Sequence, residues 1–207
     1  MKKSYLYLVT TFMLWGSLYV VSQFVLGKIP TFTVAMFRYL IAFIAISFIS
    51  LKSKKEKIEK SDYKYFFIMG FIGYFISVDC QLLGTKIAGG SMASLINSLN
   101  PIIISVMAMI ILNEKSEMNK IVGIVLSLAG VYMIIGTGAN IQFLGVLISF
   151  IAVIGWAFMS VISRKISNKY SALTLTKVSM LIATVCNIPV SFLEIQVTHP
   201  LIQIDIG

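Results

Sequence analysis

Long apolar runs separated by short polar or charged segments are the main pattern along this chain. Seven runs come close to the roughly 20 residues that a helix needs to cross a bilayer: residues 5–27, 32–51, 65–83, 91–112, 121–137, 143–163 and 173–193. In lipid only helices and closed barrels satisfy their backbone polar groups, and no ten-residue alternation indicates a barrel. The pattern predicts an all-α, polytopic transmembrane helix bundle that has the lipid bilayer as its surroundings.

The charged residues add an orientation to this picture. The chain is 58% hydrophobic and 12% charged, with a net charge of +9. If the N-terminus is cytoplasmic, thirteen Lys and Arg residues fall inside, only Lys28 and Lys86 fall outside, and Arg38 and Lys177 fall within spans. This is the positive-inside pattern, so we expect a multi-pass protein of a bacterial cytoplasmic membrane. The basic charge then sets topology, and no nucleic-acid partner is expected.

A repeat joins the two ends of the chain. Trp15 and Trp156, the only tryptophans, lie 141 residues apart. Each is part of a stripe with steps of four, four and three, which places its members on one helix face: Thr11, Trp15, Tyr19 and Ser22 in the first case, and Ala152, Trp156, Ser160 and Ser163 in the second. We interpret residues 1–140 as a first repeat of five helices and residues 141–207 as the start of a second.

An odd number of helices in a repeat inverts the next copy in the membrane, and inverted repeats place substrates near the midplane. If the repeat is real, about three helices, or ~80–100 residues, are missing from the second copy. We therefore expect a fragment, a truncated reading frame, or a chain completed by a second copy or by a partner chain.

Several stretches resemble one family. They are residues 14–17 in the first span, 30–38 at the second, 91–101 in the fourth, 113–115 after it and 123–130 in the fifth. Together they resemble EamA-type members of the drug/metabolite transporter superfamily. The resemblance implies ten helices in two inverted repeats. It also implies a permease that moves metabolites, amino acids or drugs by alternating access, with no enzymatic activity and no cofactor.

Polar and aromatic residues within the spans are the candidate substrate-binding residues. The residues that we expect to face a central cavity between the first, third, fourth and sixth helices are Trp15, Tyr19, Gln81, Asn97, Asn100 and Trp156. Each has an alternative role in helix packing, because small polar residues often join helices in membranes. Ser94, Asn97, Ser98, Pro101 and Ser105 share one face of the fourth span, which should point toward protein or water.

Three charges within spans also need an explanation. Arg38 lies about 10 Å below the outer end of its helix at 1.5 Å per residue, and Asp79 lies at similar depth. Arg38 could pair with Asp79 or bind a substrate carboxylate, and both side chains could instead extend to the headgroups. Lys177 resembles an inverted-repeat counterpart of Arg38, with interfacial snorkelling as the alternative.

The remaining candidates have gating or structural roles. They are Gln23, near the outer surface; Asp79; Pro101, which lacks an N–H and opposes the carbonyl of Asn97; Glu114, at the cytoplasmic end of the fourth span; and Lys177.

Other function classes fit less well. Cys80 and Cys186 lie in separate spans and His199 is the single histidine, so neither a metal site nor a disulfide framework is expected. An embedded enzyme needs convergent acids, histidines or a metal. Seven spans with Lys177 in the last also invite a retinal-type photoreceptor, but the predicted topology and the shallow depth of Lys177 oppose it. A non-transporting subunit that pairs with a separate second half remains an alternative.

Overall fold

The computed structural model describes residues 2–53, 56–113 and 142–198, together with residues 122, 123, 126, 130 and 133. Every regular element in these ranges is a helix. Six spans are long and apolar enough to cross a membrane, and they match six of the seven predicted runs. The fifth run, residues 121–137, lies almost entirely outside the described residues, and Glu114 lies outside them as well.

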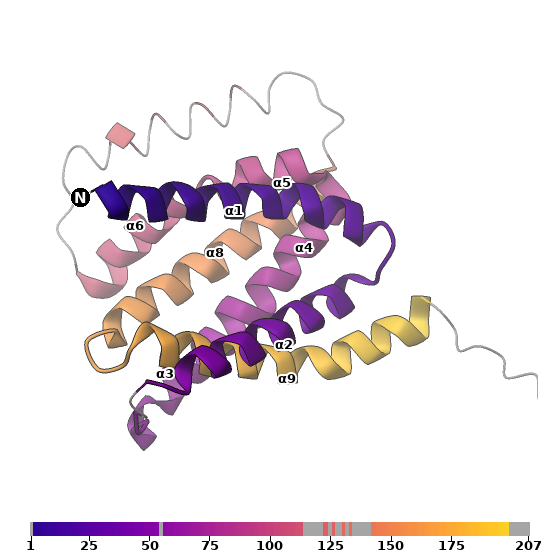
Figure 1. The fold of residues 1–207 in the computed structure, drawn as a ribbon. Helices are drawn as coiled ribbons and strands as arrows, with labels where there is room; N and C mark the ends of the chain where they lie inside the picture. Colours follow the sequence, from indigo (N-terminus) through magenta and orange to yellow (C-terminus); the bar gives the residue numbers. More distant parts are fainter. Residues whose placement is uncertain are drawn as a thin grey trace, which may run out of the picture.

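The first two spans are α1 (Lys2–Leu26) and α2 (Thr31–Ser50). The third is one long rod of four segments: η1 (Lys60–Asp62), α3 (Tyr63–Ile68), the π-helix η2 (Met69–Ile76) and α4 (Ser77–Ala88). The last two are α8 (Phe143–Ile166) and α9 (Ala172–Thr198). Figure 1 shows these helices as a bundle in which α4 and α8 cross and α2 lies beside α9.

The fourth span differs from the single helix that the sequence predicts. It consists of α5 (Gly90–Asn97) and α6 (Asn100–Leu112), separated by Ser98 and Leu99. The break has a simple cause, because Pro101 stands in the first turn of α6. A proline ring has no N–H to donate and fits only the first turn of a helix.

Small residues allow α4 and the end of η2 to pack closely along α8. A Cβ on Gly73 would overlap Met159, and one on Gly84 would overlap Ser149. Between these points the Ser77 hydroxyl donates to the Ala152 carbonyl at 2.7 Å. Close approach through small residues is how helices associate in lipid, where no hydrophobic force brings them together. The order of these contacts also shows that α4 and α8 run antiparallel.

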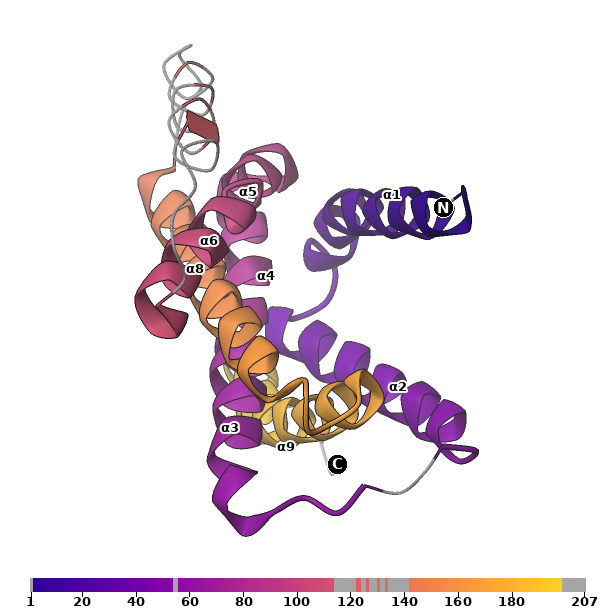
Figure 2. The same cartoon turned by 90° about the vertical axis from the view of Figure 1, so that its left-hand side faces the viewer.

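α2 and α9 lie side by side as an antiparallel pair (Figure 2). A glutamate accepts backbone hydrogen bonds at each end of this pair. At the start of α2, Glu194 accepts from the backbone N–H groups of Thr31 and Phe32, both at 2.7 Å. At the start of α9, Glu56 accepts from the N–H of Ser171 at 3.0 Å. A carboxylate at a helix N-terminus satisfies free donors and complements the helix dipole. The Ser171 N–H, followed by the Thr174 side chain, therefore lowers the pKa of Glu56 below its ordinary value.

The loops at this end of α9 meet through a second polar cluster. Lys169 pairs with Asp62 at 3.1 Å and with Glu59 at 3.5 Å, and the Tyr170 hydroxyl donates to Asp62 at 2.9 Å. The side-chain hydrogen bond to Asp62, more than any other contact, raises the pKa of Lys169. Residues 51–62 and 167–171 therefore lie at the same end of the bundle.

The opposite end of the bundle fixes the relative direction of α1 and α8. Near the end of α1, Gln23 Oε1 accepts from the N–H of Gly90 at 3.1 Å. Near the start of α8, Gly145 packs against Ala88, two residues from Gly90. Thus α8 begins at the end of the bundle where α1 finishes, the relation that an inverted repeat predicts.

Candidate functional site

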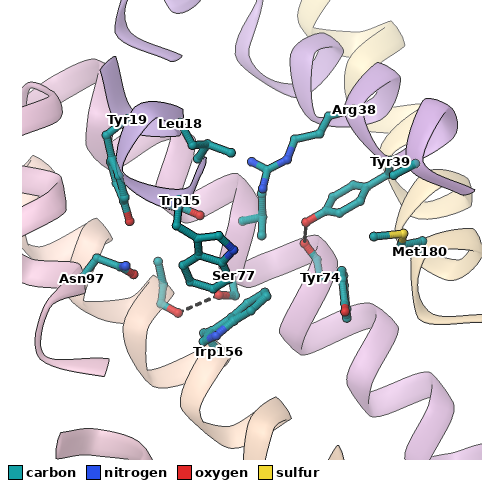
Figure 3. A pocket seen from close by; sticks show the side chains of 14 residues that line it. Trp15, Leu18, Tyr19, Arg38, Tyr39, Tyr74, Ser77, Asn97, Trp156 and Met180 are labelled. Atoms are coloured by element: carbon teal, nitrogen blue, oxygen red, sulfur yellow. Dashed lines mark hydrogen bonds between the residues drawn. The ribbon is translucent and has the colours of Figure 1, made fainter. Parts of the chain in front are cut away.

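A cavity of about 320 Å³ lies where helices from the first part of the chain, residues 2–113, meet α8 and α9 (Figure 3). This volume is at the lower end of the range for small-molecule sites. Its lining comes from seven elements: Trp15, Leu18 and Tyr19 of α1; Arg38, Tyr39 and Ala42 of α2; Tyr74 of η2; Ser77, Val78 and Gln81 of α4; Asn97 of α5; Ala152 and Trp156 of α8; and Met180 of α9. We call it the central pocket.

The two tryptophans meet in this pocket. The rings of Trp15 and Trp156 are 5.5 Å apart at their centroids and inclined by 70°, which is the favoured edge-to-face geometry. Trp156 also packs against Tyr74 at 5.8 Å. Trp15 is still 46% exposed, so part of its ring is available for contact with a ligand.

Polar groups reach the central pocket from several sides. Arg38 extends into it in Figure 3, and its Nη1 is buried without a hydrogen-bond partner. The Tyr19 hydroxyl faces Gln81 but is likewise without a hydrogen bond. Asn97 accepts from Asn100 through Oδ1, which leaves its Nδ2 available to donate. Because buried polar groups normally have partners, this set of donors fits a ligand that accepts hydrogen bonds.

An irregular helix forms one wall of the pocket. The Tyr39 hydroxyl donates at 2.8 Å to the backbone carbonyl of Tyr74, which lies in η2. A π-helix widens the spacing of backbone hydrogen bonds and is frequent at functional sites. Here it presents a carbonyl sideways to α2, so that α2 and the third span are joined directly at the pocket.

The structure brings together six of the seven residues that the sequence proposes as substrate ligands. The exception is Asn100, which is buried beside the pocket and donates from Nδ2 to Asn97 at 2.6 Å. Asn100 therefore orients a lining residue without lining the pocket itself.

The polar face predicted for the fourth span is only partly directed inward. Asn97 reaches the central pocket, whereas Ser98 and Pro101 are exposed among the described residues. Ser94 and Ser98 donate to carbonyls of their own helix, those of Ser91 and Leu95. A hydroxyl satisfied in this way can face an apolar surface, which explains why the stripe does not need to be buried.

The other gating or structural candidates lie away from the central pocket. Gln23 contacts Gly90, and Lys177 donates to Ser50 Oγ at 3.3 Å. Asp79 is buried on α4 but does not line the pocket, whereas Gln81 does. No ion pair joins Arg38 to Asp79 within the described residues.

Apart from Arg38, the lining residues of α2 and α9 were not predicted. The sequence indicated a cavity between the first, third, fourth and sixth helices, but Tyr39, Ala42 and Met180 add walls from the second and seventh. A signal was present, because Tyr39 and Met180 are separated by the same 141 residues as the two tryptophans.

Comparisons with known proteins place this arrangement in a family. The model of the EamA-like transporter family matches residues 2–136. Relatives include the uncharacterized transporter YetK of Bacillus subtilis, 26% identical over 92% of this chain and 60% of that protein. Another is an uncharacterized transporter of Archaeoglobus fulgidus, 23% identical over 88% of this chain and 65% of that protein.

The chain thus spans less than two thirds of the length of these two relatives. No solved structure matches it. The family model nevertheless covers well over half of the chain, and with six membrane-length helices around a shared pocket the protein is a member of the EamA-like transporter family.

Proposed function

We propose that this chain supplies the substrate-binding helices of a permease that moves small organic molecules across the cytoplasmic membrane, with the N-terminus in the cytoplasm. The observation that carries the proposal is the convergence of Trp15 and Trp156, 141 residues apart, in one pocket that also holds Arg38, whose buried Nη1 has no hydrogen-bond partner among the described residues. Membership in a transporter family supports the same function.

The lining favours a carboxylate with an apolar or aromatic body. Arg38 is the single charged residue among the fourteen that line the pocket. Its guanidinium matches the two oxygens of a carboxylate, while the rings of Trp15, Trp156 and Tyr39 offer aromatic walls. Tyr19 and Asn97 can donate to the same anion or to another polar group of the substrate. Amino acids, carboxylate metabolites and acidic drugs share this chemistry.

Transport requires that the pocket open alternately to the two sides. In inverted-repeat transporters one half rocks against the other around a fixed midplane site. The opposed directions of α1 and α8, and of α2 and α9, support this mechanism here, because each pair contributes side chains to the pocket. We propose residues 1–140 and 141–207 as parts of these two halves.

A second candidate function is that of a membrane subunit that binds substrate but transports it only with further helices from a second copy or a partner chain. The exposed apolar surface of α1, which such helices could cover, is the observation that favours it. Large apolar side chains of α1, such as Phe12, Met13 and Phe24, are exposed and can face either lipid or such helices. Ligand binding without flux in proteoliposomes would separate this function from that of a complete permease.

The chain contains a built-in reporter for the binding step. Both of its tryptophans line the central pocket, so intrinsic tryptophan fluorescence of the protein in lipid nanodiscs reports only from this site. We expect phenylacetate to change the emission saturably and its neutral analogue phenylacetamide to bind more weakly.

Arg38→Gln tests the anion contact directly. A hydrogen bond to a charged group contributes about 1.5–3 kcal/mol, so this variant should bind phenylacetate about 10- to 150-fold more weakly. Lys177→Gln, which removes a cation outside the pocket, should leave the affinity unchanged. Equal binding by wild type and Arg38→Gln, or no saturable change with either compound, would contradict the proposed site.

A further inference from the structure

Asp79 is a buried acid that the central pocket does not use. Its neighbours Ser77, Val78 and Gln81 line the pocket, whereas Asp79 projects from another face of α4. It is 4% exposed, and neither carboxyl oxygen has a hydrogen-bond partner among the residues that the structure describes. An intramembrane acid without partners is costly when ionised and commonly marks a functional position.

Among the described residues, none that acts on the Asp79 carboxyl group supplies a compensating positive charge. From α9, Glu194 adds a second negative charge near it, and the Asn187 side chain faces it without hydrogen-bond geometry. Three further titratable groups lie close enough to Asp79 for its charge to act on them: Tyr39 of α2, Cys186 of α9 and Cys80 of α4 itself. Side chains of these types are uncharged at neutral pH. On the other side of α4, α8 presents Ser149, Ala152 and Gly155.

Two charged side chains of the neighbouring helices, Glu194 of α9 and Arg38 of α2, are directed elsewhere. Glu194 is held by the N–H groups of Thr31, Phe32 and Thr33 at the start of α2. Arg38 extends into the central pocket (Figure 3). Backbone donors therefore satisfy the carboxylate of Glu194, whereas the carboxyl group of Asp79 has no hydrogen-bond donor among the described residues.

We propose that Asp79 is held as a neutral carboxylic acid and is the proton-binding site of this permease, separate from the substrate pocket. A proton suits the site better than a metal ion, since hard cations need six or more oxygen ligands. Among the described residues no group of three or more histidines, cysteines and acids could hold a metal. When the site opens, the O–H bond of Asp79 breaks, the proton passes to water, and the electron pair stays on the carboxylate.

The structure also shows how this site connects to the pocket. Tyr39 lies close enough to both Arg38 and Asp79 for their charges to act on its hydroxyl. That hydroxyl donates to the backbone carbonyl of Tyr74 in the pocket wall. α2 is fixed to α9 by Glu194 and by the Thr33–Ser191 hydrogen bond at 2.9 Å. A shift of α2 with α9 against α4 would therefore change the access of water to Asp79 and the position of Arg38 together. This coupling, unlike the protonation of Asp79, depends on the proposed function.

Dicyclohexylcarbodiimide tests the protonation state of Asp79. The reagent takes the proton of a carboxylic acid in apolar surroundings while a carboxyl oxygen adds to its central carbon, and rearrangement leaves a stable acylurea that mass spectrometry locates. We expect labelling of Asp79 in the wild-type chain at neutral pH, loss of labelling at alkaline pH, and no protection by sodium. Asp62→Asn, which removes a loop acid paired with Lys169, should leave the labelling of Asp79 unchanged.

Each other result decides against part of the proposal. No labelling at neutral pH would show that Asp79 is ionised, and protection by sodium would show a cation site; either result overturns the proton site. Asp79→Asn should form no adduct at this position. If that variant fails to fold, the pH and sodium series on the wild-type chain still decides whether Asp79 binds a proton. Where the fluorescence titration detects phenylacetate binding, the ligand should change the rate of labelling, and an unchanged rate overturns the coupling. The labelling itself does not need substrate, so it can fail or succeed independently of the proposed pocket.

Discussion

Trp15 and Trp156 make an edge-to-face contact with their ring centroids 5.5 Å apart, although 141 residues separate them in the chain. The contact joins α1, which is otherwise largely exposed, to α8 at the centre of the bundle. At this point the first helix of one proposed repeat contacts the first helix of the other.

The energetic coupling of this pair can be measured. Aromatic pairs contribute about 0.5–1.5 kcal/mol beyond the area that they bury. We expect a double-mutant cycle with Trp15→Leu, Trp156→Leu and the double variant to give a coupling of this size in the free energy of unfolding. Additive losses would show that the rings do not stabilise each other in the bilayer.

The packing of α4 on α8 depends on the absence of a side chain at Gly84. An added Cβ would overlap the side chain of Ser149, so Gly84→Ala should destabilise the protein by about 1–3 kcal/mol, the usual cost of overpacking. Denaturant titration in mixed micelles measures this change.

Gly16 provides the matched control, because a Cβ at that position would meet nothing within 4 Å. Gly16→Ala should be neutral or should stabilise α1 by up to about 1 kcal/mol. Equal destabilisation by the two substitutions would contradict the close α4–α8 contact.

The clasp between Glu56 and the start of α9 should depend on pH. The Ser171 N–H lowers the pKa of Glu56 in the folded state, so its contribution is present above the ordinary glutamate pKa and is lost as the pH falls through the lowered value. Glu56→Gln should therefore lower the thermal midpoint at neutral pH and have little effect in acid. Glu59→Gln, which removes an exposed ion pair with Lys169, should have little effect at either pH; equal effects of both variants would contradict the clasp.

The length of the apolar runs was sufficient to predict the spans, because helix length and apolar content are set by the bilayer. Six of the predicted runs correspond to helices in the described structure. The division of the fourth span at Ser98 was not predicted, although Pro101 was identified as an irregular position. The π-helix from Met69 to Ile76 has no comparable sequence signal.

The lining of the pocket was predictable where a residue is unusual in a membrane helix. Tryptophan, arginine and amide side chains stand out in an apolar run, so Trp15, Arg38 and Asn97 were proposed from the sequence, and all three line the central pocket. Tyr39 and Met180 resemble ordinary packing residues, and only the tertiary arrangement brings them to the pocket. The glutamate clasps depend on contacts across more than 100 residues, which a single sequence does not reveal.

The central claim is that α1 and α8 enter the membrane from opposite sides and so bring Trp15 and Trp156 to one pocket. Single cysteines at exposed positions of the two ends test it most directly, in a background in which Cys80 and Cys186 are replaced. A membrane-impermeant maleimide should label Lys28→Cys and Gln142→Cys in intact cells, and Ser53→Cys and Ser167→Cys only after permeabilisation. If Ser53→Cys and Gln142→Cys report from the same compartment, the two halves are not inverted and the proposed permease site is contradicted.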